Sequence, residues 1–306
     1  MSTPTMSRPT EPGPVAPRRF ARRAALSIPR RGVVNGLMVG LTYVAAGLAM
    51  LPLILILGYI VSKGASTLSI DFFTRMPVPP GESGGGIANA IVGTLILIAV
   101  ASAIGLPIGI GAGLYLAESG ATKLATTVRF LADVLNGLPS IVMGIFAWQM
   151  LVRPVGHFSA LAGGVALAAM MIPLVTRTTE EMVRTVPSAL REAALALGYT
   201  RWRTSLTVVL RTAAAGIVTG ALVAVARIAG ETAPLLFTAL GNSFWSTALD
   251  QPIAALPLQI FSYATGPYDE WHAQAWAGSL VLIALVLVIS IIARYVTRAR
   301  YGRGAD

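Results

Sequence analysis

The sequence RTVPSALREAALALGYTRWRTSLTVVLR, from Arg184 to Arg211, is the longest polar interruption in the otherwise apolar second half of the chain. A short amphipathic helix fits inside it over residues 188–198, because apolar residues recur there at spacings of four and three: Leu190, Ala194 and Leu197. Gly198 can end this helix, since glycine adopts the left-handed cap conformation at little cost. We therefore expect a short helix on a charged loop between membrane spans, placed to dock on a partner.

The composition is that of an integral membrane protein. The 306 residues are 55% hydrophobic and 12% charged, with a mean hydropathy of +0.72, whereas a soluble domain carries about 25% charged residues. The chain has no cysteine and only two histidines, His157 and His272. These counts exclude disulfides and a thiolate nucleophile, and they leave little for a metal cluster.

The first apolar run, residues 33–61, is long enough to cross a hydrocarbon core of about 30 Å, and five further apolar runs follow it. The sequence therefore predicts an all-α protein with six transmembrane helices, at about residues 33–61, 87–116, 124–151, 160–175, 207–234 and 275–294. Around these spans we expect a disordered, arginine-rich arm over residues 1–32, a long outer loop over 235–273 and a tail over 301–306.

The basic residues fix the expected orientation. Of the 23 Lys and Arg residues, 19 fall on the segments that share a side with the N-terminus and three on the opposite segments: Lys63, Arg75 and Arg153. This bias predicts that both termini and the Arg184–Arg211 stretch face the cytoplasm. It also accounts for the net charge of +10 without a nucleic-acid partner, and the arginine-rich arm can lie against anionic lipid headgroups.

The remaining basic residue, Arg227, lies inside the fifth predicted span, four residues before Glu231. A lone charge at the bilayer centre costs roughly 2.5–3.5 kcal/mol, so we expect both residues to be used. One interpretation is that Arg227 faces a polar pathway for an oxyanion, balanced by Glu231, with Arg177 as a second cation. The alternatives are an ion pair that only fixes helix packing and, for Arg177, an ordinary basic residue at the inner end of a span.

The sequence supports neither of two catalytic motifs, a P-loop and a nucleophile elbow. The chain has no G-x-x-x-x-G-K-[ST] sequence, so it cannot hold ATP in a P-loop. Ser83 lies in a G-x-S-x-G match, Gly81 to Gly85, but that motif needs a preceding strand and a following helix, and here it lies in a Pro/Gly-rich loop.

Three stretches resemble a known family. Glu192, Ala193, Ala194 and Gly198 are similar to the EAA motif of ABC importer permeases. The nine residues Ala226–Pro234 resemble the R-x-x-G-E-T-A-P signature of the PstA permeases of phosphate importers, and Leu138–Phe146 resembles that family's LPSIV-x-G-I-F segment. The likeness spans about residues 33–300. Arg211 departs from it, because the EAA motif usually closes with a proline there.

The resemblance implies a type I ABC importer permease (MetI-like) fold with an added first span. It implies pairing with a PstC-type permease, two PstB-type ATPase subunits and a PstS-type phosphate-binding protein. The coupling residues would be Glu192, Ala193, Ala194 and Gly198, while Arg177, Arg227 and Glu231 would lie on the phosphate path. The chain itself would bind no cofactor, because ATP and Mg²⁺ would belong to the ATPase, and it would be no enzyme.

Three rival functions stay open. A permease for sulfate or molybdate would also carry the EAA motif, although Arg227 and Glu231-Thr232-Ala233-Pro234 favour phosphate. A membrane enzyme would need Ser83, and a membrane sensor would need no ATPase partner.

Overall fold

The computed structural model describes residues 20–82 and 84–301, with the side chains of residues 20–31 and 296–301 left aside. Within these ranges every element is helical except one isolated bridge between Leu240 and Ile253, so the predicted all-α class is confirmed. The chain divides into two units, residues 1–58 and residues 59–306, and each is described by itself.

The first unit holds most of helix α1, Phe20–Gly64. The sequence predicts a disordered arm over residues 1–32. Residues 20–32 are instead part of the first helix, and residues 1–19 lie outside the described residues. Alanine, leucine and arginine, which recur from Phe20 to Leu26, are among the strongest helix formers. The basic composition of the segment therefore did not prevent a helix.

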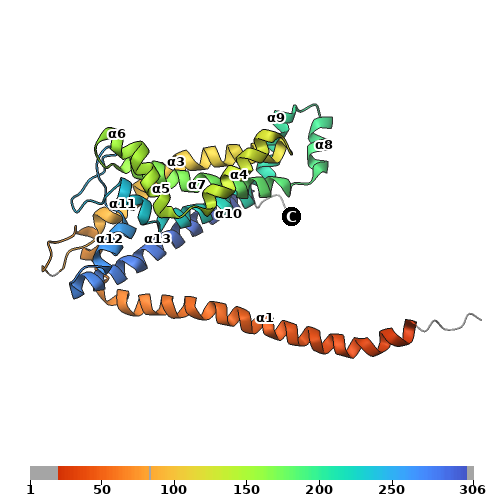
Figure 1. The fold of residues 1–306 in the computed structure, drawn as a ribbon, viewed down its shortest axis with the longest axis horizontal. Coiled ribbons are helices and arrows are strands. Elements are labelled where there is room, and N and C mark those ends of the chain that lie inside the picture. The colour runs from red at the N-terminus through yellow and green to blue at the C-terminus, as the bar shows by residue number, and fades with distance from the viewer. Residues whose placement is uncertain (1–19, 83, 302–306) are drawn as a thin grey trace, which may run out of the picture. The chain divides into compact units, whose positions relative to one another are not determined.

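The second unit is a bundle of long helices with short ones at both ends (Figure 1). In chain order its elements are η1 Ala65–Thr67, α2 Ile70–Thr74, α3 Ala88–Glu118, α4 Lys123–Gly137, α5 Ser140–Ala147, η2 Trp148–Val152, α6 Arg153–Val155, α7 Ala160–Arg184, α8 Ser188–Ala196, α9 Arg201–Thr204, η3 Ser205–Val209, α10 Leu210–Ala229, α11 Ala233–Thr238, α12 Leu256–Ala264 and α13 Asp269–Tyr301.

Five described helices are long and apolar enough to cross a membrane: Gly32–Thr67, Ala88–Glu118, Ala160–Arg184, Arg201–Ala229 and Asp269–Tyr295. A sixth crossing would be the pair Lys123–Gly137 and Ser140–Val155, whose axes differ by 106°. The predicted third span, 124–151, is therefore sharply bent where Leu138 and Pro139 take extended backbone angles. The residue before a proline avoids the helical region, and this ends α4.

Three predicted boundaries were wrong. The fourth span, predicted to end at residue 175, continues as α7 to Arg184. The fifth, predicted over 207–234, begins in α9 and ends at Ala229. The predicted outer loop 235–273 contains most of α11 and all of α12, two short helices that carry a proline in their first turn, where its missing N–H costs nothing. The predicted tail lies almost wholly outside the described residues.

Helices α3 and α7 pack closely along a ridge of small residues. A Cβ on Gly105, Gly109 or Gly113 would come within 2.9 Å of an atom of α7. The partners advance along α7 in step with the glycines, from Met171 through Val175 to Thr179. The two helices are therefore parallel neighbours, as a glycine every fourth residue permits.

Helix α10 runs antiparallel to α7. A Cβ on Gly216 would meet Met182, and one on Gly220 would meet Thr178. Seven residues beyond Gly220 along α10 is Arg227, and seven residues before Thr178 along α7 is Met171. Arg227 is therefore level with Met171, near the middle of the 25-residue helix α7. Arg227 therefore lies at about the middle of the bundle's length.

Candidate translocation and coupling sites

The predicted docking helix is α8, Ser188–Ala196. Gly198 follows it with φ of +84°, in the left-handed region that favours glycine. Thr200 then caps α9, because its hydroxyl accepts a hydrogen bond from the Arg203 N–H. The sequence predicted a helix over 188–198 that Gly198 ends; the structure confirms the helix, which runs to Ala196 and is followed by the Gly198 turn.

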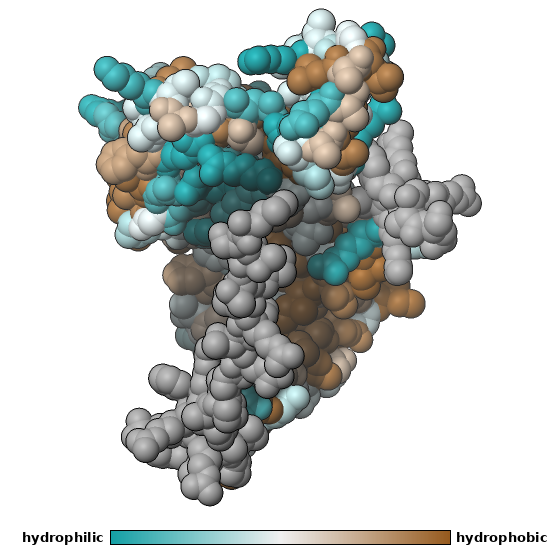
Figure 2. Space-filling model, turned by 90° about the vertical axis from the view of Figure 1, so that its right-hand side faces the viewer, coloured by the Kyte–Doolittle hydropathy of each residue, from teal (hydrophilic) through white to brown (hydrophobic). Residues whose placement is uncertain are grey.

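Helix α8 presents most of its surface outward. Ala194 is buried, whereas Glu192, Ala193 and Gly198 are exposed. Beyond the helix, Leu197 and Trp202 are also exposed. Figure 2 faces the end of unit 2 that carries α8 and α9, and hydrophilic residues gather over that end. The four predicted coupling residues thus lie together on a projecting element, three of them accessible to a partner.

Arg227 and Glu231 lie at the end of α10. The predicted fifth span held both residues, but the helix ends at Ala229, so one continuous helix face does not carry both. The structure still brings the two side chains together, with Arg227 Nε 3.9 Å from Glu231 Oε1. The Arg227 side chain is 44% exposed and that of Glu231 is 18% exposed. The arginine therefore faces outward from the chain at mid-bundle depth.

Arg227 ends an uncovered stripe along α10. Ala215, Thr219 and Val223 precede it at intervals of four residues, and all are exposed. Positions four apart lie one above another on a helix, so the stripe is a single narrow face with small or short side chains. This face has room for a pathway or a neighbouring helix beside the guanidinium.

Arg177 is not a free cation. Its Nε lies 2.9 Å from Asp133 Oδ1, and its Nη1 donates to Glu180 Oε2 at 2.8 Å. The structure therefore does not bring Arg177 together with Arg227 and Glu231. It assigns Arg177 to a separate ionic cluster at the end of α7 nearer α8.

The comparisons with known proteins agree with these features. The family described as "Binding-protein-dependent transport system inner membrane component" matches residues 105–300. "Phosphate transport system permease protein PstA" of Yersinia pestis is 51% identical over 245 residues, covering 80% of this chain and 83% of the relative. The protein of that name from Xylella fastidiosa strain Temecula1 is 47% identical over 267 residues, covering 87% and 93%.

This chain belongs to the PstA permease family. A more distant relative, the "Probable phosphate transport system permease protein PstA" of Methanocaldococcus jannaschii, is 40% identical and covers 81% of the chain. The likeness in the three motifs therefore reflects common ancestry over most of the length. As a PstA family member, the chain is a multi-pass membrane protein and a subunit of a multi-subunit ABC transporter.

Solved structures confirm the permease fold. The inward-facing MetNI methionine ABC transporter matches with a TM-score of 0.54 at 22% identity, covering 70% of this chain and 94% of that one. A bacterial alginate ABC transporter in complex with its periplasmic protein matches with a TM-score of 0.61 at 13% identity, covering 89% and 96%. The predicted MetI-like architecture is thus correct for this PstA family member.

The most important residue that the sequence did not reveal is Glu180, in the last turn of α7. Glu180 is 1% exposed, and its carboxylate forms ion pairs with three arginines: Arg129, Arg177 and Arg184. The sequence carried one signal, an acidic residue flanked by arginines three before and four after it. The partner from α4, Arg129, is distant in sequence, so only the fold reveals it.

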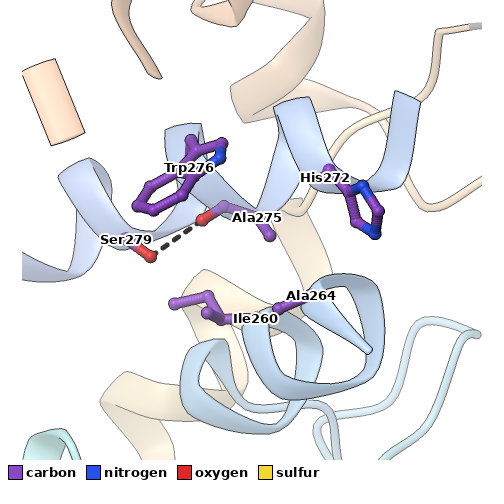
Figure 3. A pocket seen from close by; sticks show the side chains of 6 residues that line it. All are labelled: Ile260, Ala264, His272, Ala275, Trp276 and Ser279. Carbon is purple, nitrogen blue, oxygen red and sulfur yellow. Dashed lines mark hydrogen bonds between the residues drawn. The ribbon is translucent and has the colours of Figure 1, made fainter. Parts of the chain in front are cut away.

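Two cavities of this PstA family member lie apart from the predicted pathway residues. One of about 310 Å³ opens between α12 and α13, where Ile260 and Ala264 of α12 lie across from His272, Ala275, Trp276 and Ser279 of α13 (Figure 3). The other, of about 550 Å³, is lined by the Pro77–Pro80 segment and aromatic residues of the α11–α13 region. Arg177, Arg227 and Glu231 line neither, so neither cavity offers an arginine to an oxyanion.

Two other kinds of site bear on function, a metal cluster and a nucleophile elbow at Ser83. The described residues contain no group of three or more His, Asp or Glu side chains placed to hold a metal ion. Ser83, on which the enzyme alternative depends, lies outside the described residues. The described residues on either side of it form turn and coil, without the strand that a nucleophile elbow needs.

Proposed function

We propose that this chain is the permease subunit of an ATP-driven importer of inorganic phosphate, where it forms half of the translocation pathway. One observation carries the proposal: at mid-bundle depth, on a face of α10 that stays exposed among the described residues, lies the arginine of the motif shared with the PstA family. The phosphate named in the relatives' descriptions supplies the cargo.

The chemistry of Arg227 suits this cargo. A guanidinium offers planar, paired N–H donors that match phosphate oxygens, and it stays charged at any relevant pH. Glu231, 3.9 Å away, partly balances the charge and keeps the site from holding a dianion too tightly. Conduction requires binding that is weak enough for release.

The role proposed for Arg177 is that of a second cation nearer the cytoplasm. Its present partners are the carboxylates of Asp133 and Glu180. An incoming phosphate would therefore compete with carboxylate oxygens for the same guanidinium, so Arg177 would engage phosphate only in a state where these pairs loosen.

Energy for transport would come from partner subunits. The chain has no P-loop, so we assign ATP hydrolysis and bound Mg²⁺ to a PstB-type ATPase dimer, with no enzyme activity in this chain. Helix α8 would fit a groove on the ATPase, where Glu192 would meet a basic residue. A PstC-type permease would complete the pathway, a PstS-type protein would deliver phosphate, and lipid would surround the spans.

The proposed location is the bacterial inner membrane, with both termini and α8 in the cytoplasm. The excess of Lys and Arg on the segments at that side supports this orientation. Closure of the ATPase dimer on ATP would then draw the coupling helices together and open the pathway outward. Hydrolysis would return it to the inward-facing state, with no nucleic acid involved.

Anion import by the complete complex in proteoliposomes tests the proposal. The vesicles would hold ATP, and the binding protein would be supplied outside with radiolabelled phosphate, sulfate or molybdate in turn. We expect uptake of phosphate that depends on both ATP and the binding protein, with little uptake of the other two. Import of sulfate or molybdate in place of phosphate would overturn the assignment.

A further inference from the structure

The inner end of the bundle contains a buried carboxylate with three cationic partners. Glu180 Oε1 lies 2.6 Å from Arg129 Nε and 2.6 Å from Arg184 Nη2, while its Oε2 lies 2.8 Å from Arg177 Nη1. A charge in the protein interior is tolerated only when it is paired and hydrogen-bonded. Glu180 meets that requirement with residues of two different helices.

Arg129 extends the contact to a third helix. Its Nη2 donates to the Leu116 carbonyl at 2.6 Å and to the Gly120 carbonyl at 2.9 Å. Carbonyls at the end of a helix lack partners within it, and α3 ends at Glu118. One guanidinium therefore joins the end of α3 to α4 and, through Glu180, to α7.

The coupling helix is attached to this same end of α3. Arg191 of α8 forms an ion pair with Glu118 through Nη1, and its Nη2 donates to the Val183 carbonyl of α7 at 3.0 Å. Its side chain is partly covered. A displacement of α8 is thus passed directly to the ends of α3 and α7, next to the carbonyls that Arg129 holds.

Arg177 closes the network on the other side. It reaches back from α7 to Asp133 of α4, while Arg129 reaches from α4 to Glu180 of α7. Two ion pairs of opposite polarity therefore bridge the same two helices. The pair of Arg129 with Glu180 is the most buried of these contacts, and the low dielectric around a buried pair strengthens its hydrogen bonds. The pair of Arg177 with Asp133 lies nearer the surface and adds a second bridge between α4 and α7.

We propose that Glu180 is a positioning residue for coupling: it links the coupling helix α8, through α3 and α4, to the guanidinium of Arg177. When the ATPase moves α8, the network carries the movement to α7 and changes where Arg177 is held. This inference rests on the proposed function only in treating the chain as an ATP-driven permease. The identity of the anion does not enter it.

A purely local role for Glu180 makes a different prediction. If the carboxylate only neutralises buried charge, its three arginines are equivalent and losing any one has a similar effect. If it links helices, Arg129 matters most, because among these three arginines it alone joins Glu180 to the end of α3, and it pairs α4 directly with Glu180. Arg184 lies on α7 itself, four residues from Glu180, so its loss leaves the link between helices intact.

The test is the number of anions imported per ATP hydrolysed by the complete complex in proteoliposomes. We expect Glu180→Gln to lower this ratio about tenfold, within the range typical of coupling between sites, while the subunits still co-purify. Glu181→Gln is the matched control, since Glu181 is the exposed neighbour on α7 and keeps the wild-type ratio. An unchanged ratio in an assembled Glu180→Gln complex would overturn the proposal.

If the complex that carries Glu180→Gln fails to assemble, a second pair of variants tests whether Glu180 links the helices. We expect Arg129→Gln to lower the ratio severalfold more than Arg184→Gln does. Equal losses in the two variants would overturn the link between helices and favour simple charge balance. The identity of the anion that the wild-type complex imports tests the proposed function separately. The ratio of anions imported to ATP hydrolysed can be measured with whichever anion that is.

Discussion

Arg227 and Glu231 face each other across the end of a helix, with Nε of the arginine 3.9 Å from Oε1 of the glutamate. Charge-assisted hydrogen bonds between such groups are about 2.7–2.9 Å long. The pair is thus held by attraction at a distance, and no side-chain hydrogen bond of Arg227 occurs among the described residues. Its donors remain available to an anion.

Removal of the Glu231 charge should tighten anion binding and slow release. In Glu231→Gln the guanidinium would be less neutralised, so we expect the KM for phosphate and the maximal uptake rate both to fall, by about two- to fivefold, the size of a partly exposed ion pair. Initial uptake rates over a range of phosphate concentrations measure both quantities. A rise in KM would contradict the balancing role.

The turn after the coupling helix depends on glycine for its conformation alone. Gly198 has φ of +84° and no heavy atom within 4 Å of an added Cβ. Gly198→Ala should therefore strain the turn by about 1–2 kcal/mol and lower the amount of ATPase that co-purifies. Gly198→Asn should do less harm, because asparagine tolerates this region. If both variants co-purify as much ATPase as the wild type does, the turn at Gly198 plays no part in binding the ATPase.

Gly113 depends on space rather than on conformation. A Cβ there would lie 2.5 Å from the Thr176 carbonyl oxygen and from the Thr179 Cβ. Gly113→Ala should force α3 away from α7 and cost about 1–3 kcal/mol, seen as a lower melting temperature in detergent. Gly111→Ala is the matched control: it lies in the same helix with nothing within 4 Å, so it should be neutral or stabilising. Similar melting temperatures for the two variants would contradict the close packing.

The ion pair between Arg191 and Glu118 should respond to an exchange of charges. Each single variant, Arg191→Glu or Glu118→Arg, places like charges together and should lower ATP-dependent uptake. The double variant restores opposite charges, and we expect it to recover a coupling energy of about 0.2–1 kcal/mol. A double-mutant cycle on uptake measures this term, and additive losses would show that the pair transmits nothing.

The sequence predicted the existence of helix α8 well, because the relevant signals are local. The spacing of Leu190 and Ala194, the glycine at 198 and the capping Thr200 all act within a few residues. Family membership was predictable for the same reason, since the motifs around Glu192, Leu138 and Arg227 are short and contiguous. Interactions that span few residues can be read along the chain.

The predictions failed where long-range contacts decide. The polar segment after residue 175 predicted the end of a span, but α7 continues through it to Arg184. Its charged residue Glu180 can be buried there because Arg129, 51 residues earlier, pairs with it. Arg177 stays a predicted pathway cation, but the sequence did not reveal that Asp133 and Glu180 form ion pairs with it. The break after Ala229 was visible in Gly230 but was overlooked, since the apolar run continues past it. Burial and pairing, not local propensity, set these features.

The most direct test of the central claim is phosphate uptake by the assembled complex carrying Arg227→Gln. Hydrogen bonds to charged groups contribute roughly 1.5–3 kcal/mol, so we predict that uptake falls by about tenfold or more while the partner subunits still co-purify. Arg153→Gln, an exposed arginine in α6 away from α10, serves as the control and should import phosphate normally. Uptake by Arg227→Gln equal to that of the control would contradict the claim that phosphate passes Arg227.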